Sequence, residues 1–134
     1  MMIGILRSKK QATTAKVLIV DDEPDIVNII KCHLECCKCE VVTAANGKEG
    51  LEKAAKEKPD LILLDVNMPT MNGLQMLERL REDPNLKDIP VIMVTVVCEP
   101  QNIAVASSYS VADYISKPFE LNELAEKVAK ALNI

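Results

Sequence analysis

The apolar residues of this chain gather in short unbroken runs that are separated by longer mixed stretches. The runs cover residues 17–20, 41–42, 61–64, 91–94 and, more weakly, 114–115. Unbroken runs of this length are typical of parallel strands that are covered on both faces of a sheet. The pattern therefore predicts five strands.

The stretches between the runs carry apolar residues at the three-to-four spacing of amphipathic helices. Predicted helices start at Pro24, at Asn46-Gly47, at Asn72-Gly73, at Pro100 and near Leu121. Five strands alternating with five helices predict an α/β fold, a doubly wound, open parallel sheet with helices on both faces.

Polar residues follow the apolar runs at the places where such a sheet binds its ligands, the carboxyl ends of the strands. Asp21 and Asp22 follow the first run, Asp65 the third, Thr95 the fourth and Lys117 the fifth. Each residue type alone is more often a helix cap, a turn residue or a solvated side chain. The prediction of a site therefore rests on their joint placement at one edge.

Carboxylates that lie close together repel one another, and a hard divalent cation such as Mg²⁺ relieves this repulsion. A cation at this edge favours a phosphoryl ligand. Lys117 can pair with a carboxylate or with a phosphoryl oxygen, and Thr95 can donate a hydrogen bond to the same oxygen. Asp65, on the most central strand, is the candidate nucleophile for an aspartyl-phosphate.

Composition narrows the functional classes. The chain has 134 residues, enough for one ordinary core, and its net charge of −4 argues against a general affinity for nucleic acid or anionic membrane. The chain has five cysteines, and four of them lie between Cys32 and Cys39. The odd number and the crowding favour a reducing, cytoplasmic location. No apolar run approaches the roughly 20 residues of a membrane span.

Four segments carry a resemblance to a known family. They read VLIVDDE at 17–23, DVNMPTMNG at 65–73, VT at 94–95 and YISKPF at 114–119. In this order and at these separations they resemble the receiver domain of two-component response regulators, over residues 16–134. The resemblance implies a flavodoxin-like sheet of order 2-1-3-4-5 and a phosphorylatable signalling switch, not an enzyme that turns over a separate substrate. Residues 1–15 are expected to form a flexible tail.

The resemblance also implies roles for individual residues. Asp65 would accept a phosphoryl group from a phosphohistidine on a sensor histidine kinase or a histidine phosphotransfer protein. Asp22, Asp65 and the backbone carbonyl of Asn67 would bind Mg²⁺, with Asp21 acting partly through water.

The remaining implied roles concern the phosphoryl oxygens and the output. Thr95 and Lys117 would bind these oxygens, and the Lys117–Pro118 bond would be cis. Tyr114 stands at the aromatic switch position and would move inward as Thr95 shifts toward the phosphate. The surface of the fourth helix, fifth strand and last helix would bind a downstream protein target, without direct contact to nucleic acid or membrane.

The sequence departs from the family pattern at three places. Val96 follows Thr95, where a small residue is usual. Ser110-Val111 stands where Gly-Ala is usual, and Lys38-Cys39 where a Gly and an aromatic are usual.

Four alternatives compete with this interpretation. An aspartyl-phosphate enzyme of the haloacid-dehalogenase type needs an Asp as general acid where this chain has Asn67. A metal or redox site in the Cys32–Cys39 segment lacks a paired Cys-x-x-Cys spacing, and Cys37 falls on the apolar stripe of the first helix. A receiver-like domain that is never phosphorylated is disfavoured because every required residue is present. We expect a single-domain receiver of the chemotaxis type; the alternative is a receiver excised from a longer regulator with an output domain.

Overall fold

The computed structural model describes residues 14–68, 70–96 and 108–134. Its strands form one parallel sheet in the order β2-β1-β3-β4-β5, which confirms the predicted topology. The strands are β1 Lys16–Val20, β2 Glu40–Ala44, β3 Leu61–Leu64, β4 Val91–Thr95 and β5 Asp113–Ser116. Four of the five predicted helices lie within the described residues, as α2 Pro24–Cys36, α3 Gly47–Glu57, α4 Gly73–Glu82 and α6 Leu121–Leu132. The helix predicted from Pro100 begins outside the described residues. Most of the predicted tail, residues 1–13, also lies outside them.

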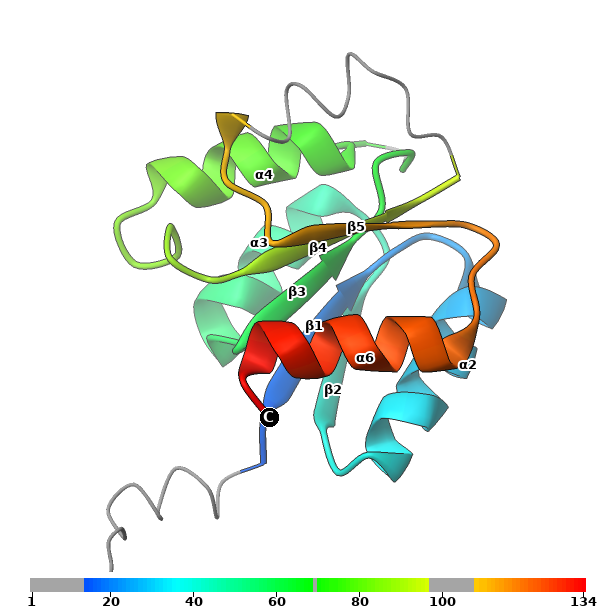
Figure 1. Ribbon diagram of the computed structural model, residues 1–134. Helices are drawn as coiled ribbons and strands as arrows, with labels where there is room; N and C mark the ends of the chain where they lie inside the picture. The colour runs from blue at the N-terminus through cyan, green and yellow to red at the C-terminus, as the bar shows by residue number, and fades with distance from the viewer. Residues whose placement is uncertain (1–13, 69, 97–107) are drawn as a thin grey trace, which may run out of the picture.

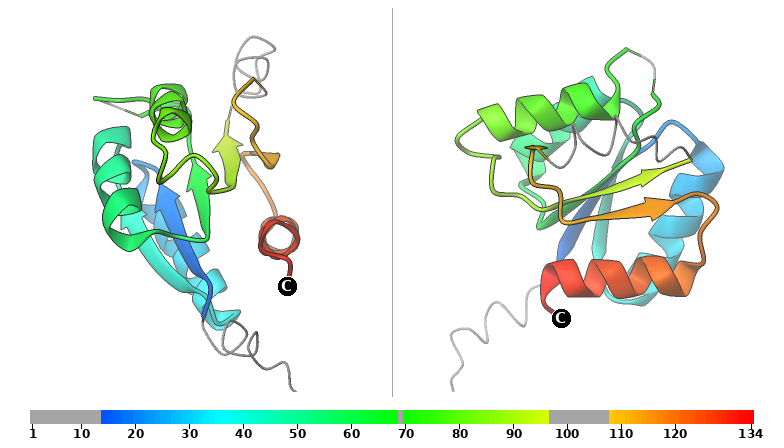
Figure 2. Two further views of the ribbon diagram at one scale, coloured as in Figure 1. Left: turned by 90° about the vertical axis from the view of Figure 1, so that its left-hand side faces the viewer. Right: turned by 45° about the horizontal axis from the view of Figure 1, so that its top comes forward.

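The helices cover both faces of the sheet (Figure 1). Viewed along the sheet, α6 lies on one side and α3 and α4 lie on the other (Figure 2, left). Side chains alternate between these faces. In β1, Val17 and Ile19 join the core under α2 and α6, while Leu18 and Val20 join the core under α3 and α4. Both sets need apolar side chains, which explains the unbroken apolar runs.

The first turns of the helices follow from local sequence. Pro24 occupies the first turn of α2, where its missing N–H costs no hydrogen bond. Asn46 caps α3 by accepting a hydrogen bond from the backbone of Glu49 at 2.9 Å. Asn72 caps α4 in the same way and forms a reciprocal capping box with Gln75.

The end of α2 differs from the sequence prediction. The helix stops at Cys36, and Cys37 is an exposed cap residue, although its spacing had placed it on the apolar stripe. Lys38 then turns the chain with a φ of 67°. Lys38 N–H donates to Glu35 O, and Cys39 N–H donates to Leu34 O, both at 3.0 Å, which is the Schellman pattern.

Within the described residues, no helix is both long enough and apolar enough to cross a membrane.

Candidate functional site

The site is built where the backbone ladder runs one residue beyond the strands. Asp21 N–H donates to Ala44 O, and Asp65 N–H donates to Val20 O, both at 3.0 Å. Lys117 N–H donates to Thr95 O at 2.9 Å. Because all three bonds continue the parallel register, they fix the backbones of Asp21, Asp65 and Lys117 at one edge of the sheet.

Lys117 is the centre of the charge arrangement. Its Nζ lies 2.7 Å from Asp21 Oδ2, 2.7 Å from Glu23 Oε1 and 3.4 Å from Asp65 Oδ2. Asp21, Asp65 and Lys117 are all buried, whereas Glu23 is exposed. One cation therefore balances three carboxylates, and the site keeps an excess of negative charge.

The aspartates can supply ligands for a metal ion. Asp21, Asp22 and Asp65 each offer a carboxylate oxygen, and these atoms lie within 4.8 Å of one another. Asp22 is exposed, so this side of the cluster is open to solvent. An all-oxygen ligand set with room for water suits Mg²⁺.

Burial and a neighbouring like charge both disfavour the ionised form of Asp65. Burial raises the pKa of its carboxyl, the neighbouring Asp21 carboxylate raises it further, and Lys117 only partly offsets the change. For Lys117 itself, burial lowers the pKa, but hydrogen bonds to Asp21 and Glu23 outweigh burial and the net pKa is raised. Lys117 is therefore a fixed positive charge, while Asp65 carries a charge that its surroundings disfavour.

Thr95 adds a hydroxyl donor to the site. Its Oγ1 is buried and has no hydrogen-bond partner among the described residues. A buried hydroxyl without a partner costs free energy, so this position favours a ligand that brings an acceptor oxygen. The three aspartates and the Thr95 hydroxyl together fit a bound cation and a phosphoryl group.

A match to a family model shows which protein family the chain belongs to. Residues 17–129 match the model of the response regulator receiver domain. The chain belongs to this family. Receiver domains are signalling phosphoacceptors that bind Mg²⁺ at an acidic pocket and interact with histidine kinases.

Curated relatives of this receiver domain include transcriptional regulators. It is 37% identical over 117 residues to the alkaline phosphatase synthesis transcriptional regulatory protein PhoP of Bacillus subtilis, covering 87% of this chain and 48% of that protein. It is 34% identical, with the same coverage, to the DNA-binding dual master transcriptional regulator RpaA of Synechocystis. The chain thus spans about half the length of the curated relatives it matches.

Solved structures of single receiver domains are matched over nearly their whole length. The chemotaxis protein CheY4 of Vibrio cholerae superposes with a TM-score of 0.85 at 33% identity, covering 90% of this chain and 100% of that chain. A CheY-like receiver domain protein of Methanospirillum hungatei superposes with a TM-score of 0.86 at 32% identity, with coverages of 90% and 95%.

The structure places the other residues that the sequence singled out. Asn67 is exposed beside the site, and its N–H donates to Asp65 Oδ1 at 3.4 Å. Tyr114 is half-buried and packs against the core under α3 and α4. The Lys117–Pro118 bond is cis, as the resemblance implied.

Two residues at the site of the receiver domain had no predicted role. Glu23 pairs with Lys117, and its only sequence signal is its position directly after the two aspartates. Gly73 allows a close approach, because a Cβ at this position would lie 2.0 Å from Asp65 O. Gly73 N–H also donates to Val66 O at 2.9 Å, which folds the start of α4 back onto the end of β3.

The cysteine segment of the receiver domain does not assemble a second metal site. Cys32, Cys36 and Cys37 are exposed, and Cys39 is buried with its pKa raised mainly by burial. Within the described ranges, the aspartate cluster is the one group of at least three potential ligands that come together.

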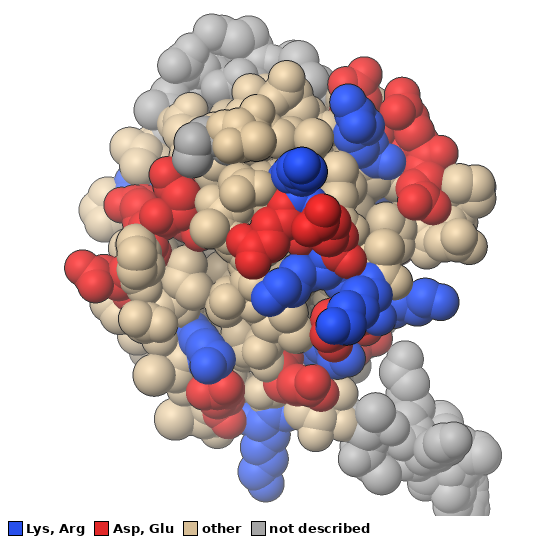
Figure 3. Space-filling view, turned by 180° about the vertical axis from the view of Figure 1, so that it is seen from behind, with Lys and Arg blue, Asp and Glu red and all other residues tan. Residues whose placement is uncertain are grey.

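The surface charge of one face also bears on partners. From behind, Lys and Arg side chains are interspersed with Asp and Glu (Figure 3). Near the middle of that face several Lys and Arg side chains lie close together, next to Asp and Glu side chains.

Proposed function

We propose that this receiver domain is a signalling switch that takes a phosphoryl group from a phosphohistidine onto Asp65. The observation that carries the proposal is the surroundings of Asp65: a buried carboxylate faces Lys117 Nζ at 3.4 Å and shares its site with Asp21 and Asp22. The unpartnered Thr95 hydroxyl supports the same conclusion.

In the proposed transfer, a carboxylate oxygen of Asp65 attacks the phosphorus atom. A P–O bond forms, the P–N bond to the histidine breaks, and its electron pair returns to the imidazole. Lys117 and Thr95 stabilise the charge on the phosphoryl oxygens, and Lys117 moves part of its interaction from carboxylate to phosphate.

Mg²⁺ would be held by Asp22, Asp65 and the Asn67 carbonyl, with Asp21 contributing partly through water. When bound, the ion neutralises carboxylate and phosphoryl charge that Lys117 alone cannot balance. The chain's own part is to hold Asp21 and Asp65 close together, which the backbone ladder at the strand ends achieves.

The output would follow from a change in protein-binding surface. After phosphorylation, the Thr95 hydroxyl would donate a hydrogen bond to a phosphoryl oxygen. Tyr114 on the neighbouring strand would then move inward. The proposed target surface comprises the fourth helix of the family, which begins outside the described residues, with β5 and α6. We propose a cytoplasmic location, with a histidine kinase or phosphotransfer protein as donor and a protein as target.

The central test measures the phosphoryl group directly. Acetyl phosphate and Mg²⁺ are added to the full chain, and intact mass is recorded. We expect a species heavier by one phosphoryl group in wild type and in the exposed control Asp88→Asn, and none in Asp65→Asn. A full-strength phosphorylated species in Asp65→Asn would overturn the assignment.

The metal assignment has its own test. Asp22→Ala should lose more Mg²⁺ affinity than any other single aspartate variant that keeps Asp65, because Asp22 is proposed as a direct ligand. Phosphorylation is measured over a Mg²⁺ titration. Normal phosphorylation of Asp22→Ala at low Mg²⁺ would show that the ion is bound elsewhere.

A second candidate function is that of an input domain within a longer regulator. It is favoured by the curated relatives, of which the chain covers 46–52%. The size of the native protein in its source cells decides between the two: a mass near 14.8 kDa supports the single-domain function, and a mass about twice as large supports the alternative.

A further inference from the structure

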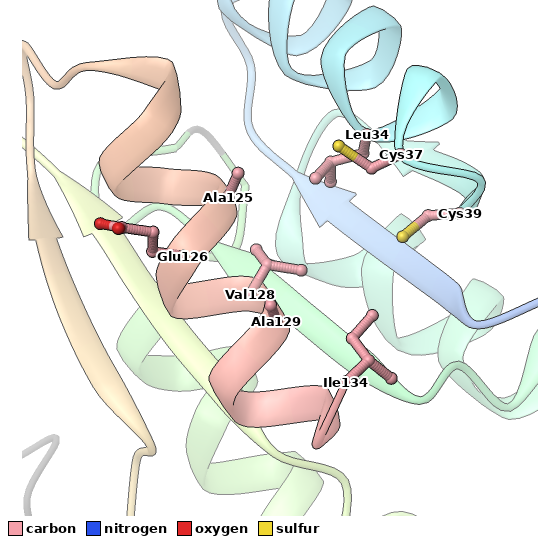
Figure 4. A pocket seen from close by; sticks show the side chains of 8 residues that line it. All are labelled: Leu34, Cys37, Cys39, Ala125, Glu126, Val128, Ala129 and Ile134. Carbon is pink, nitrogen blue, oxygen red and sulfur yellow. The ribbon is translucent and has the colours of Figure 1, made fainter.

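A pocket lies at the end of the sheet opposite the aspartate cluster, between the end of α2 and the second half of α6. Its volume is about 290 Å³. Most of its lining is apolar, from Leu34, Cys37, Cys39, Val128, Ala129 and Ile134. Figure 4 shows side chains from both helices and from the chain end pointing toward this space. Ile134 is 75% exposed, so the apolar surface continues to the outside.

The chain enters the sheet directly beside this pocket. Ala15 O accepts a hydrogen bond from Glu40 N–H at 2.8 Å, and Lys16 pairs with Glu40 in the parallel register. Ala15 therefore lies next to Cys39, the residue before Glu40. Because side chains alternate along a strand, Ala15 is on the same face as Val17, the face of α2 and α6.

The segment that precedes this point has a matching composition. Residues 1–6 read MMIGIL and contain no charged side chain. Residues 7–13, the tether between this segment and β1, read RSKKQAT and carry three positive charges. Eight residues from Leu6 to Thr14 can span up to about 26 Å when extended, which is longer than a five-residue strand. The apolar segment can therefore reach any part of the pocket.

The positive charges of residues 7–13 also favour a course of the chain beside this pocket. The carboxylates of Glu40 and Asp60 lie at the start of β1, where Asp60 Oδ2 accepts a hydrogen bond from Lys16 N–H at 2.8 Å. Both residues are exposed. The basic tether would leave the sheet past these carboxylates, whereas the uncharged segment beyond it matches the apolar lining.

We propose that this pocket is the docking site of the chain's own apolar N-terminal segment, residues 1–6. The segment covers the groove between α2 and α6 and removes apolar side chains on both partners from water. The proposal is independent of phosphorylation at Asp65, which lies at the other end of the strands.

The test uses the full chain with ¹³C-labelled methyl groups. In wild type, we expect nuclear Overhauser contacts from the methyl groups of Ile5 and Leu6 to those of Leu34 and Val128. The double variant Ile5→Asp/Leu6→Asp should lose these contacts and shift the Leu34 and Val128 methyl signals. The matched control Ser8→Asp/Gln11→Asp adds the same charge to the tether and should leave the contacts in place.

A pocket-side variant gives an independent readout. Ala129→Leu fills the space from α6, so Ile3, Ile5 and Leu6 should move to the methyl positions of an unstructured peptide. The proposal is overturned if wild type already shows those positions for all three residues. It is also overturned if the contacts weaken on dilution and appear between differently labelled chains, because the occupant is then a second copy.

Discussion

The charge balance of the aspartate cluster depends on one side chain, Lys117. It contacts Asp21 and Glu23 at 2.7 Å each and Asp65 at 3.4 Å. Asp65 is thus the least well paired of the three, and burial and Asp21 raise its pKa. A site that binds an additional cation needs this excess of negative charge, and the folded protein loses stability to maintain it.

The first prediction concerns Asp65→Asn in the absence of Mg²⁺. The pKa of Asp65 is raised in the folded state, so its charge opposes folding once the pH rises above the ordinary value of 3.8. The variant should be more stable than wild type at pH 7.5 by about 1 kcal/mol. Toward pH 4 the gain should fall, because the wild-type carboxyl becomes protonated.

Urea unfolding at both pH values measures this difference. Asp88→Asn is the control, since it removes an exposed carboxylate and should change the free energy of unfolding little at either pH. Equal stability of Asp65→Asn and wild type at pH 7.5 would mean that Lys117 fully compensates the Asp65 charge.

The second prediction concerns the lifetime of the aspartyl-phosphate. Val96 directly follows Thr95 and is 61% exposed, so we expect its branched apolar side chain to border the approach to the phosphoryl group. It excludes volume and cannot orient a water molecule for attack on phosphorus. Val96→Ala should therefore speed both loading from acetyl phosphate and spontaneous loss, each several-fold.

Decay of the purified phosphoprotein at saturating Mg²⁺ provides the measurement. Ile29→Ala, an exposed apolar residue on α2, serves as the control and should decay like wild type. If Val96→Ala decays at the wild-type rate or more slowly, Val96 does not control access of water.

At the scale of elements, two of the sequence departures coincide with unusual backbone. Lys38 and Ser110 both stand at positions where the family usually has glycine. Both residues have a positive φ, 67° for Lys38 and 60° for Ser110. Arg81 donates to Tyr109 O at 2.7 Å, which ties the chain just before Ser110 to the last turn of α4. These turns are thus held by tertiary contacts and helix-end hydrogen bonds, at some conformational cost.

The third prediction tests this cost at the end of α2. Lys38→Gly should stabilise the protein by up to about 1 kcal/mol, because glycine adopts the left-handed conformation without steric penalty and the penalty exceeds the extra entropy of the unfolded chain. Lys31→Gly, in the interior of the same helix, should instead destabilise it by about 1 kcal/mol. Free energies of unfolding from urea titrations should therefore change with opposite sign, and a loss of stability in both variants would contradict the prediction.

At the scale of the whole molecule, the site and the proposed output surface share two neighbouring strands. Thr95 ends β4, and Tyr114 lies in β5, paired with Met93. Lys127 of α6 donates to Tyr114 O and to Asp113 Oδ1, both at 3.1 Å. A change at Thr95 therefore has a continuous route of contacts through β5 to α6.

The fourth prediction concerns this route. Beryllofluoride with Mg²⁺ should shift the backbone NMR signals of β5 and α6, including Tyr114 and Lys127, and Asp65→Asn should show none of these shifts. The physical reason is that a ligand at Asp65 can change the surface of β5 and α6 only if the domain has two conformations that bind this ligand with different affinity. Changes confined to α2 would exclude coupling through Thr95 and Tyr114.

The sequence alone determined the layers of this receiver domain and the edge that carries its site. Strands that are buried on both faces need apolar side chains at every position, so runs such as 17–20 and 61–64 stand out. Parallel strands end at the same edge, so a polar residue after each run predicts a shared site. The strand order, which apolar runs by themselves leave open, was implied by the resemblance to receiver domains.

Only the tertiary structure decided how the residues at that edge share their charges. The contact between Lys117 and Glu23 joins side chains 94 positions apart, and the Thr95 hydroxyl is buried without a hydrogen-bond partner among the described residues. The pocket beside Ile134 likewise arises where separate elements meet. A sequence pattern reports the average environment of a position, whereas distances of 2.7 Å and unfilled space depend on how several elements pack at once.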